Sequence, residues 1–229
     1  MLREIVLDTE TTGLDPLKGD RLVEIGCVEL VNRFPTGRSY HQRINPERDV
    51  PAEAFAVHGL STEFLATMPK FTEVVDGFLD FIGDAPLVIH NAQFDHGFLC
   101  AELKLLKRPL IASERLVDTL LLARRKHSAG PYNLDALCQR YGIDNSKRTK
   151  HGALLDAELL AEVYLELIGA RQASLILLDT ARAATTSSGG RNARPRPAPL
   201  APRITEAEQA AHDAFVATLG DEAVWKVYR

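Results

Sequence analysis

Cysteine is scarce in this sequence, and its three cysteines lie far apart. Cys27, Cys100 and Cys138 form no C-x-x-C pair within the 229 residues. A disulfide framework needs an even set of cysteines, and a cysteine zinc site needs closely spaced ones. The sequence therefore argues against both and predicts reduced, packed thiols.

Long apolar runs and an excess of positive charge are missing as well. No run of about 18 apolar residues occurs, which excludes a membrane-spanning helix. The opening stretch "MLREIVLDTE" lacks the regions of a signal peptide, so we expect a cytoplasmic protein. The formal net charge is −4, which argues against a strong electrostatic grip on nucleic acid. A protein of this charge that acts on DNA or RNA should hold a short piece, use metal ions or be delivered by a partner.

What the sequence does contain is an alternation of strand-like and helix-like segments over residues 1–170. The hydrophobic periodicity and the turn signals predict both kinds of element. The expected strands are 3–10, 21–31, 38–46 and 85–92, and 115–127 is expected to be a strand that passes into a helix. The expected helices are 62–83 with a break at Met68-Pro69, 94–107, 133–143 and 152–169. This order predicts an α/β domain with one mixed β-sheet flanked by helices.

The composition changes after Gly169. Residues 179–203 are rich in Ala, Ser, Gly, Pro and Arg, and they have almost no large apolar residue. Such a composition predicts a flexible linker. Residues 204–229 regain apolar side chains, including Trp225, but they are too few to form a core of their own. We therefore expect a flexible C-terminal tail that docks on a partner.

The stretch "VLDTETTGLD" places two acids at the end of an apolar strand. Asp8 and Glu10 are two residues apart, so in a strand both side chains project from one face. Two carboxylates at this range repel each other and raise each other's pKa unless a cation lies between them. Taken alone, the pair also fits a turn cap and a solvated surface acid.

Three further polar residues lie where elements begin. Asp95 in "VIHNAQFDHGF" falls in the first turn of a helix, where an acid is also favoured by the helix dipole. His151 precedes the last helix, and Asp156 lies inside it, in line with an apolar stripe that faces the core. An acid in that position needs a partner, and the helix itself offers no basic one.

Taken together, D-x-E on a first strand, N-x-x-F-D after a later strand and H-x(4)-D at a last helix resemble the DEDDh family of 3′→5′ exonucleases. The stretches "LDTETTGL", "VHGL" and "NSKRTKHGALLDAELLAEVYL" are similar to the proofreading members that serve bacterial replicative DNA polymerases. The resemblance covers residues 3–170 and implies a ribonuclease-H-like sheet. It implies that two divalent cations, Mg²⁺ or Mn²⁺, bind to four carboxylates, and that His151 is the general base. These carboxylates are Asp8, Glu10, Asp95 and Asp156.

The expected substrate is the 3′ end of single-stranded or frayed DNA, from which 5′-mononucleotides are released. Thr9, Thr11 and Thr12 follow the first acid and are candidates to contact the terminal nucleotide. The resemblance implies that Glu53 and His58 contact its sugar and base. Three other polar residues are left out of the site. Asp118 is expected to be an N-cap, Asp135 an acid favoured by the helix dipole and His90 a hydrogen-bonded structural residue.

The resemblance also implies partners for the tail. Gln172, Leu175 and Leu177 resemble a short sliding-clamp-binding motif, which should bind weakly because it lacks the usual aromatic residue. The alternative for this stretch is ordinary helix continuation. Residues 204–229, with Trp225 as anchor, are expected to bind the polymerase subunit. Two other functions stay open, a stand-alone nuclease for RNA or repair intermediates and a catalytically inactive scaffold, although all five catalytic positions are intact.

Overall fold

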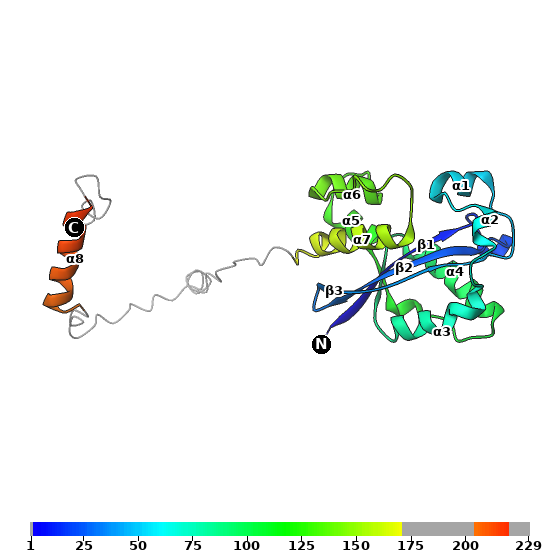
Figure 1. Ribbon diagram of the computed structural model, residues 1–229, viewed down its shortest axis with the longest axis horizontal. Helices are drawn as coiled ribbons and strands as arrows, with labels where there is room; N and C mark the ends of the chain where they lie inside the picture. Colours follow the sequence, from blue (N-terminus) through cyan, green and yellow to red (C-terminus); the bar gives the residue numbers. More distant parts are fainter. Residues whose placement is uncertain (1, 171–203, 220–229) are drawn as a thin grey trace, which may run out of the picture. The chain divides into compact units, whose positions relative to one another are not determined.

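The computed structural model describes residues 2–170 and 204–219, which belong to two separate units of the chain (Figure 1). The first unit contains the β-sheet and seven of the α-helices described below, and the second contains the helix α8. Each unit is described by itself. Within the described residues, no helix is long and apolar enough to cross a membrane.

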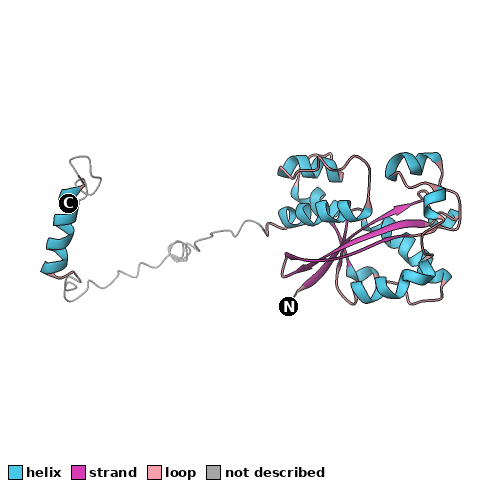
Figure 2. Ribbon diagram, in the orientation of Figure 1, coloured by secondary structure: helices cyan, strands magenta, loops and turns pink. Residues whose placement is uncertain are grey.

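The first unit is built on a five-stranded mixed sheet with the strand order β3-β2-β1-β4-β5 (Figure 2). The first three strands pair antiparallel, and β4 and β5 continue the sheet parallel to β1. This confirms the predicted α/β class. The strands are β1 (Arg3–Thr11), β2 (Leu22–Val31), β3 (Phe34–Arg43), β4 (Leu87–Ile89) and β5 (Leu116–Asp118).

The third strand begins four residues earlier than the sequence predicts. Val31 pairs with Phe34, so Asn32 and Arg33 are the two central residues of a tight hairpin. Both have positive φ, 50° and 68°, as a hairpin turn that matches the strand twist requires. Asn-Arg is not a typical sequence for such a turn, which is why the hairpin was not expected.

Helices cover both faces of the sheet, and β1 contributes to both cores. Ile5 and Leu7 pack with α3 (Phe71–Ile82) and α4 (Ala92–Leu105) on one face. Val6, pointing the opposite way, packs on the face covered by α5, α6 and α7 (Figure 1). This alternation is the period of a strand. The three helices on that face are α5 (Thr119–Lys126), α6 (Leu134–Tyr141) and α7 (Ala153–Leu167).

Two short helices, α1 (Ala52–His58) and α2 (Thr62–Leu65), connect β3 to α3. The sequence prediction missed α1 because its seven residues show little periodicity. Pro51 precedes the helix, and Gly59 ends it with a left-handed φ of 74°. Proline before a helix and glycine after it are the signals that mark such a segment. Two single-turn 3₁₀ segments, Pro16–Lys18 and Ser113–Arg115, complete this unit.

The second unit is described over one helix, α8 (Glu206–Thr218). Thr205 and Glu208 form a capping box, in which each side chain binds the other residue's backbone N–H. This arrangement satisfies donors that a helix otherwise leaves free at its N-terminus. The three cysteines are free thiols, as the sequence predicts.

Candidate active site

Four carboxylates from three distant parts of the chain approach one another at the end of β1, and we call them the acidic cluster. Asp8 and Glu10 belong to β1, whereas one acid each comes from the first turns of α4 and α7. Their mutual repulsion contributes to the raised pKa of the β1 acids. The members of the acidic cluster are Asp8, Glu10, Asp95 and Asp156.

The close approach of α7 to β1 depends on a glycine in the neighbouring strand. Gly26 pairs directly with Asp8. A Cβ atom at Gly26 would lie 2.2 Å from the backbone of Ala153, the first residue of α7. The amide of Ala153 also donates to the buried Glu24 carboxylate at 2.9 Å. The start of α7, and with it Asp156, is therefore fixed against β2, the strand that pairs with the one that carries Asp8 and Glu10.

Three carboxylates of the acidic cluster have raised pKa values in this arrangement. Burial raises the pKa of Glu10 to about 8, helped by the neighbouring Asp156 carboxylate. Burial also raises the pKa of Asp95 to about 7. The pKa of Asp8 is raised well above its ordinary value by burial and then by Asp95 and Glu10. A cation placed among these groups would favour their charged forms.

Asp95 is oriented by a residue of β1. Its Oδ1 accepts hydrogen bonds from the backbone N–H of Thr9 at 3.0 Å and from the Thr9 hydroxyl at 2.6 Å. Both bonds favour the charged form of Asp95 and so oppose the effect of its burial. Thr9, a predicted substrate contact, thus uses its hydroxyl and its N–H within the chain.

Asp156 has a basic partner that the sequence interpretation missed. The guanidinium of Arg148 donates to both carboxylate oxygens, at 2.6 Å and 2.7 Å. It also donates to His151 Nδ1 at 2.9 Å. Arg148 lies in the loop before α7, outside the helix that carries Asp156. The sequence "NSKRTKH" offered a signal, a basic residue close before the histidine.

The donor set suits a hard divalent cation. Glu10, His151 and Asp156 each place a ligand atom within 4.8 Å of the others. Magnesium prefers carboxylate oxygens together with water and phosphate. The side chain of His151 is 47% exposed, so it borders solvent beside the buried acids. The residues present therefore fit a metal centre at this position.

A pocket of about 460 Å³ lies next to the acidic cluster. It contains all five residues expected to contact the substrate, although Thr11 and Thr12 also have hydrogen bonds within the chain. His58 is buried, and its Nδ1 accepts from the backbone of Leu60, while Nε2 has no partner among the described residues. The lining includes Thr9, Glu10, Thr11, Thr12, Glu53, Val57, His58 and Phe94.

The three polar residues left out of the site have structural contacts. Asp118 caps α5 by accepting from the N–H groups of Leu120 and Leu121. His90 bonds the hydroxyl of Thr119 at 2.9 Å. Asp135, predicted only to favour the start of α6, has a further contact, because it accepts from Arg148 at 2.7 Å.

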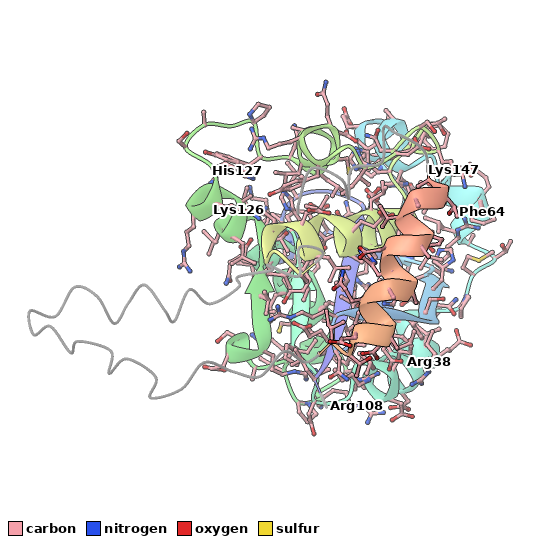
Figure 3. The ribbon with its side chains drawn as sticks, turned by 90° about the vertical axis from the view of Figure 1, so that its left-hand side faces the viewer. Arg38, Phe64, Arg108, Lys126, His127 and Lys147 are labelled. Atoms are coloured by element: carbon pink, nitrogen blue, oxygen red, sulfur yellow. The ribbon has the colours of Figure 1, made fainter. Side chains whose placement is uncertain are left out.

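Three of the basic side chains labelled in Figure 3 lie apart from one another. Arg108, Lys126 and Lys147 lie at three separate edges of the view in Figure 3. Arg108 is paired with Asp76, and Lys126 binds backbone carbonyls at the end of α7.

A mixed sheet with a carboxylate cluster at the end of its first strand is the arrangement of a metal-dependent nuclease. Residues 5–164 match the exonuclease family RNase_T, and the chain belongs to this family. Solved structures agree in fold. Exonuclease X in complex with 5′ overhanging duplex DNA is similar at a TM-score of 0.56 and 24% identity, over 74% of this chain and 92% of that one. The nuclease domain of 3′hExo, a DEDDh family member bound to rAMP, is similar at a TM-score of 0.63 and 15% identity. This likeness covers 73% of this chain and 92% of that one.

Relatives of higher sequence identity show to which group within the exonuclease family the chain is most similar. It is 56% identical over 181 residues to the DNA polymerase III subunit epsilon of Rickettsia conorii. The matched residues make up 78% of this chain and 79% of the relative. The Escherichia coli K12 subunit epsilon is 52% identical over 174 residues, or 73% and 72% of the two chains. The chain therefore belongs with the DNA polymerase III epsilon subunits within the exonuclease family.

Four predicted residues lie outside the described part of the chain. The expected clamp-binding residues Gln172, Leu175 and Leu177 fall in 171–203, and Trp225 falls in 220–229. Of the expected polymerase-binding tail 204–229, residues 204–219 are described. The domain boundaries and the roles of these residues stay predictions.

Proposed function

We propose that this chain is the proofreading 3′→5′ exonuclease of a replicative DNA polymerase, which hydrolyses the terminal nucleotide of a mismatched 3′ end. The observation that carries the proposal is the acidic cluster, whose carboxylates meet beside a pocket of the size of a nucleotide site. Repelling carboxylates at such a position have a physical reason to be there only when they bind cations.

Two Mg²⁺ or Mn²⁺ ions are the expected cofactors, held by Asp8, Glu10, Asp95 and Asp156. When bound, such a pair activates water and stabilises the leaving oxygen in a phosphodiester hydrolysis. Four carboxylates supply enough negative charge for two divalent ions. The single guanidinium of Arg148 does not balance that charge.

His151 is the proposed general base. A histidine side chain can accept a proton from water and later release it to solvent. Its exposed side chain lies 3.5 Å from Asp156, so it lies at the edge of the acidic cluster and not inside the core. The backbone N–H of His151 donates to Val57 of α1 at 3.2 Å, which ties the base to the pocket wall.

The pocket is the proposed site of the terminal nucleotide. Glu53 and His58 come from α1, Thr9 and Thr11 come from the end of β1, and Thr12 directly follows it. The unpartnered Nε2 of the buried His58 is available to a sugar or base atom. A frayed end enters such a pocket more easily than a paired one, because a mismatched base costs less to unpair.

Residues 204–229 are the proposed attachment to the polymerase III alpha subunit, and Gln172, Leu175 and Leu177 a weak contact with the sliding clamp. On α8, Phe215 is 61% exposed and the neighbouring Leu219 is 46% exposed. Large apolar side chains of this kind are typical anchors of a protein interface. A tether of this length would keep the nuclease at high effective concentration beside the polymerase.

The deciding experiment is digestion of a 3′-mismatched primer by the full chain, with and without the polymerase subunit. We expect release of 5′-mononucleotides with Mg²⁺ or Mn²⁺, loss of activity in EDTA and loss in Asp156→Ala. Deletion of 204–229 should abolish co-purification with the polymerase subunit but not digestion itself. Absence of metal-dependent digestion would favour a scaffold, and preference for RNA without polymerase binding would favour a stand-alone nuclease.

A further inference from the structure

Arg148 is the cation nearest to the acidic cluster in the described structure, and its side chain is only 7% exposed. It makes four hydrogen bonds, two of them to Asp156 and one each to Asp135 and His151. A planar guanidinium matches a carboxylate in this two-pronged way better than a lysine does. These four hydrogen bonds hold the Arg148 guanidinium in one position beside Asp156.

The contact with Asp156 uses the oxygen atoms that a metal ion would need. Both Oδ1 and Oδ2 accept from Arg148, at 2.6 Å and 2.7 Å. The proposed function assigns the same carboxylate to a divalent cation. Like charges on the same side of one carboxylate repel, so Arg148 and a metal ion bound on that side compete for Asp156.

The contact with His151 has a second consequence. Arginine has only donors, so the Nδ1 atom of His151 must be the acceptor of the 2.9 Å hydrogen bond. A neutral imidazole that accepts at Nδ1 carries its proton on Nε2. In this arrangement neither ring nitrogen has a free lone pair with which to accept a proton.

We propose that Arg148 is a displaceable counter-ion, which covers Asp156 and His151 in the metal-free enzyme and leaves both when the metal binds. This inference rests on the metal binding of the proposed function. Asp135, 55% exposed at the outer end of the guanidinium, remains a partner after displacement. Metal binding thereby frees the base as well as the metal ligand, so an enzyme without metal holds its base inactive.

The test is the affinity of the full chain for Mn²⁺ alone, without DNA, measured by calorimetry at pH 8.0. Arg148→Gln removes the competing charge, so we expect Mn²⁺ to bind about tenfold more tightly than in the wild type. Arg148→Lys keeps the charge without the two-pronged contact and should lie between them. Arg124→Gln, an exposed arginine of α5 outside the site, is the matched control and should bind as the wild type does.

Thermal unfolding separates this role from a purely structural one. Arg148→Gln should lower the melting temperature in EDTA, and saturating Mn²⁺ should raise it by more than it raises that of the wild type. A second readout is the ¹⁵N spectrum of His151, which should show the Nε2-protonated form in the metal-free wild type and lose that preference in Arg148→Gln.

Each contrary result points to a different failure. Equal or weaker Mn²⁺ binding in both Arg148 variants would overturn the counter-ion role, because a merely structural arginine supports the site. Failure of the wild type to bind Mn²⁺, or unchanged binding in Asp156→Asn, would overturn the metal site itself and with it the proposed function.

Discussion

Glu29 and Glu102 are each 3% exposed, as deeply buried as Asp95 and Asp156, but their surroundings differ from those of the acidic cluster. Glu29 accepts hydrogen bonds from Arg3, Arg38 and Thr36. Glu102 accepts two from Arg21. These two glutamates therefore lie in complete ion pairs, Glu29 with two arginines and Glu102 with one.

The β1 acids of the cluster have no such partners. Within residues 2–170, neither the Asp8 nor the Glu10 carboxylate accepts a hydrogen bond, and Arg148 is hydrogen-bonded to Asp156 alone among the four acids of the cluster. The pKa values follow this difference. Burial alone would raise the pKa of Glu29, but the hydrogen bonds from Arg3 and Thr36 hold this pKa below its ordinary value. The pKa of Glu10 rises to about 8. Buried acids that lack cations mark a binding site, and buried acids that have them support the fold.

The largest expected effect is on activity, from Asp8→Asn. This substitution removes a carboxylate of the cluster without changing its size, so the nuclease rate should fall about a thousandfold or more. The metal-free protein should become more stable, because one source of repulsion is gone. A mismatched-primer assay and urea unfolding in EDTA measure the two effects. Near-normal activity would contradict the metal role, and lower stability would contradict the repulsion.

The opposite result is expected for Glu102→Gln. It leaves Arg21 without its charged partner, so the free energy of unfolding should fall by about 2 kcal/mol, less than for a fully buried pair because Arg21 is partly exposed. Activity per folded molecule should stay near that of the wild type. Urea unfolding and the primer assay at low temperature check both. A large loss of activity in the folded variant would show that the two groups of acids are not distinct.

A third prediction concerns pH. Glu10 has a folded-state pKa of about 8 against an ordinary value of 4.5, so between these values the folded state binds more protons than the unfolded one. This group therefore makes metal-free stability fall as the pH rises from about 5 to 8. Urea unfolding in EDTA across this range should show a shallower decline in Glu10→Gln than in the wild type. Identical slopes would mean that Glu10 ionises freely.

The smallest expected effect is that of Thr9→Val. Asp95 loses the 2.6 Å hydrogen bond from the hydroxyl but keeps the one from the backbone N–H. One charge-assisted hydrogen bond orients the carboxylate only in part, so kcat should fall about three- to tenfold. Thr9→Ser, which retains the hydroxyl, is the matched control. Equal rates in the two variants would assign the orientation of Asp95 to the backbone alone.

Much of the fold could be predicted because its signals are local. The alternation in β1 and the apolar stripe that contains Asp156 are periodic patterns within one element, and Asn133 and Gly142 mark the ends of α6 as expected. The hairpin at Asn32 and the short α1 were missed because their turn residues or lengths are atypical. Neither error moves a carboxylate of the cluster, since those acids lie at the ends of well-marked elements.

The sequence by itself determined which acids exist, on which elements they lie and that Asp8 and Glu10 share a face, because these properties depend on spacing along the chain. Only the tertiary structure decided that Thr9 would hold Asp95, 86 positions away, and that Arg148 would cover both Asp156 and His151. Such contacts depend on how loops and helices close over the sheet. No periodicity records that closure, because a charge finds its partner through space, whatever their separation in sequence.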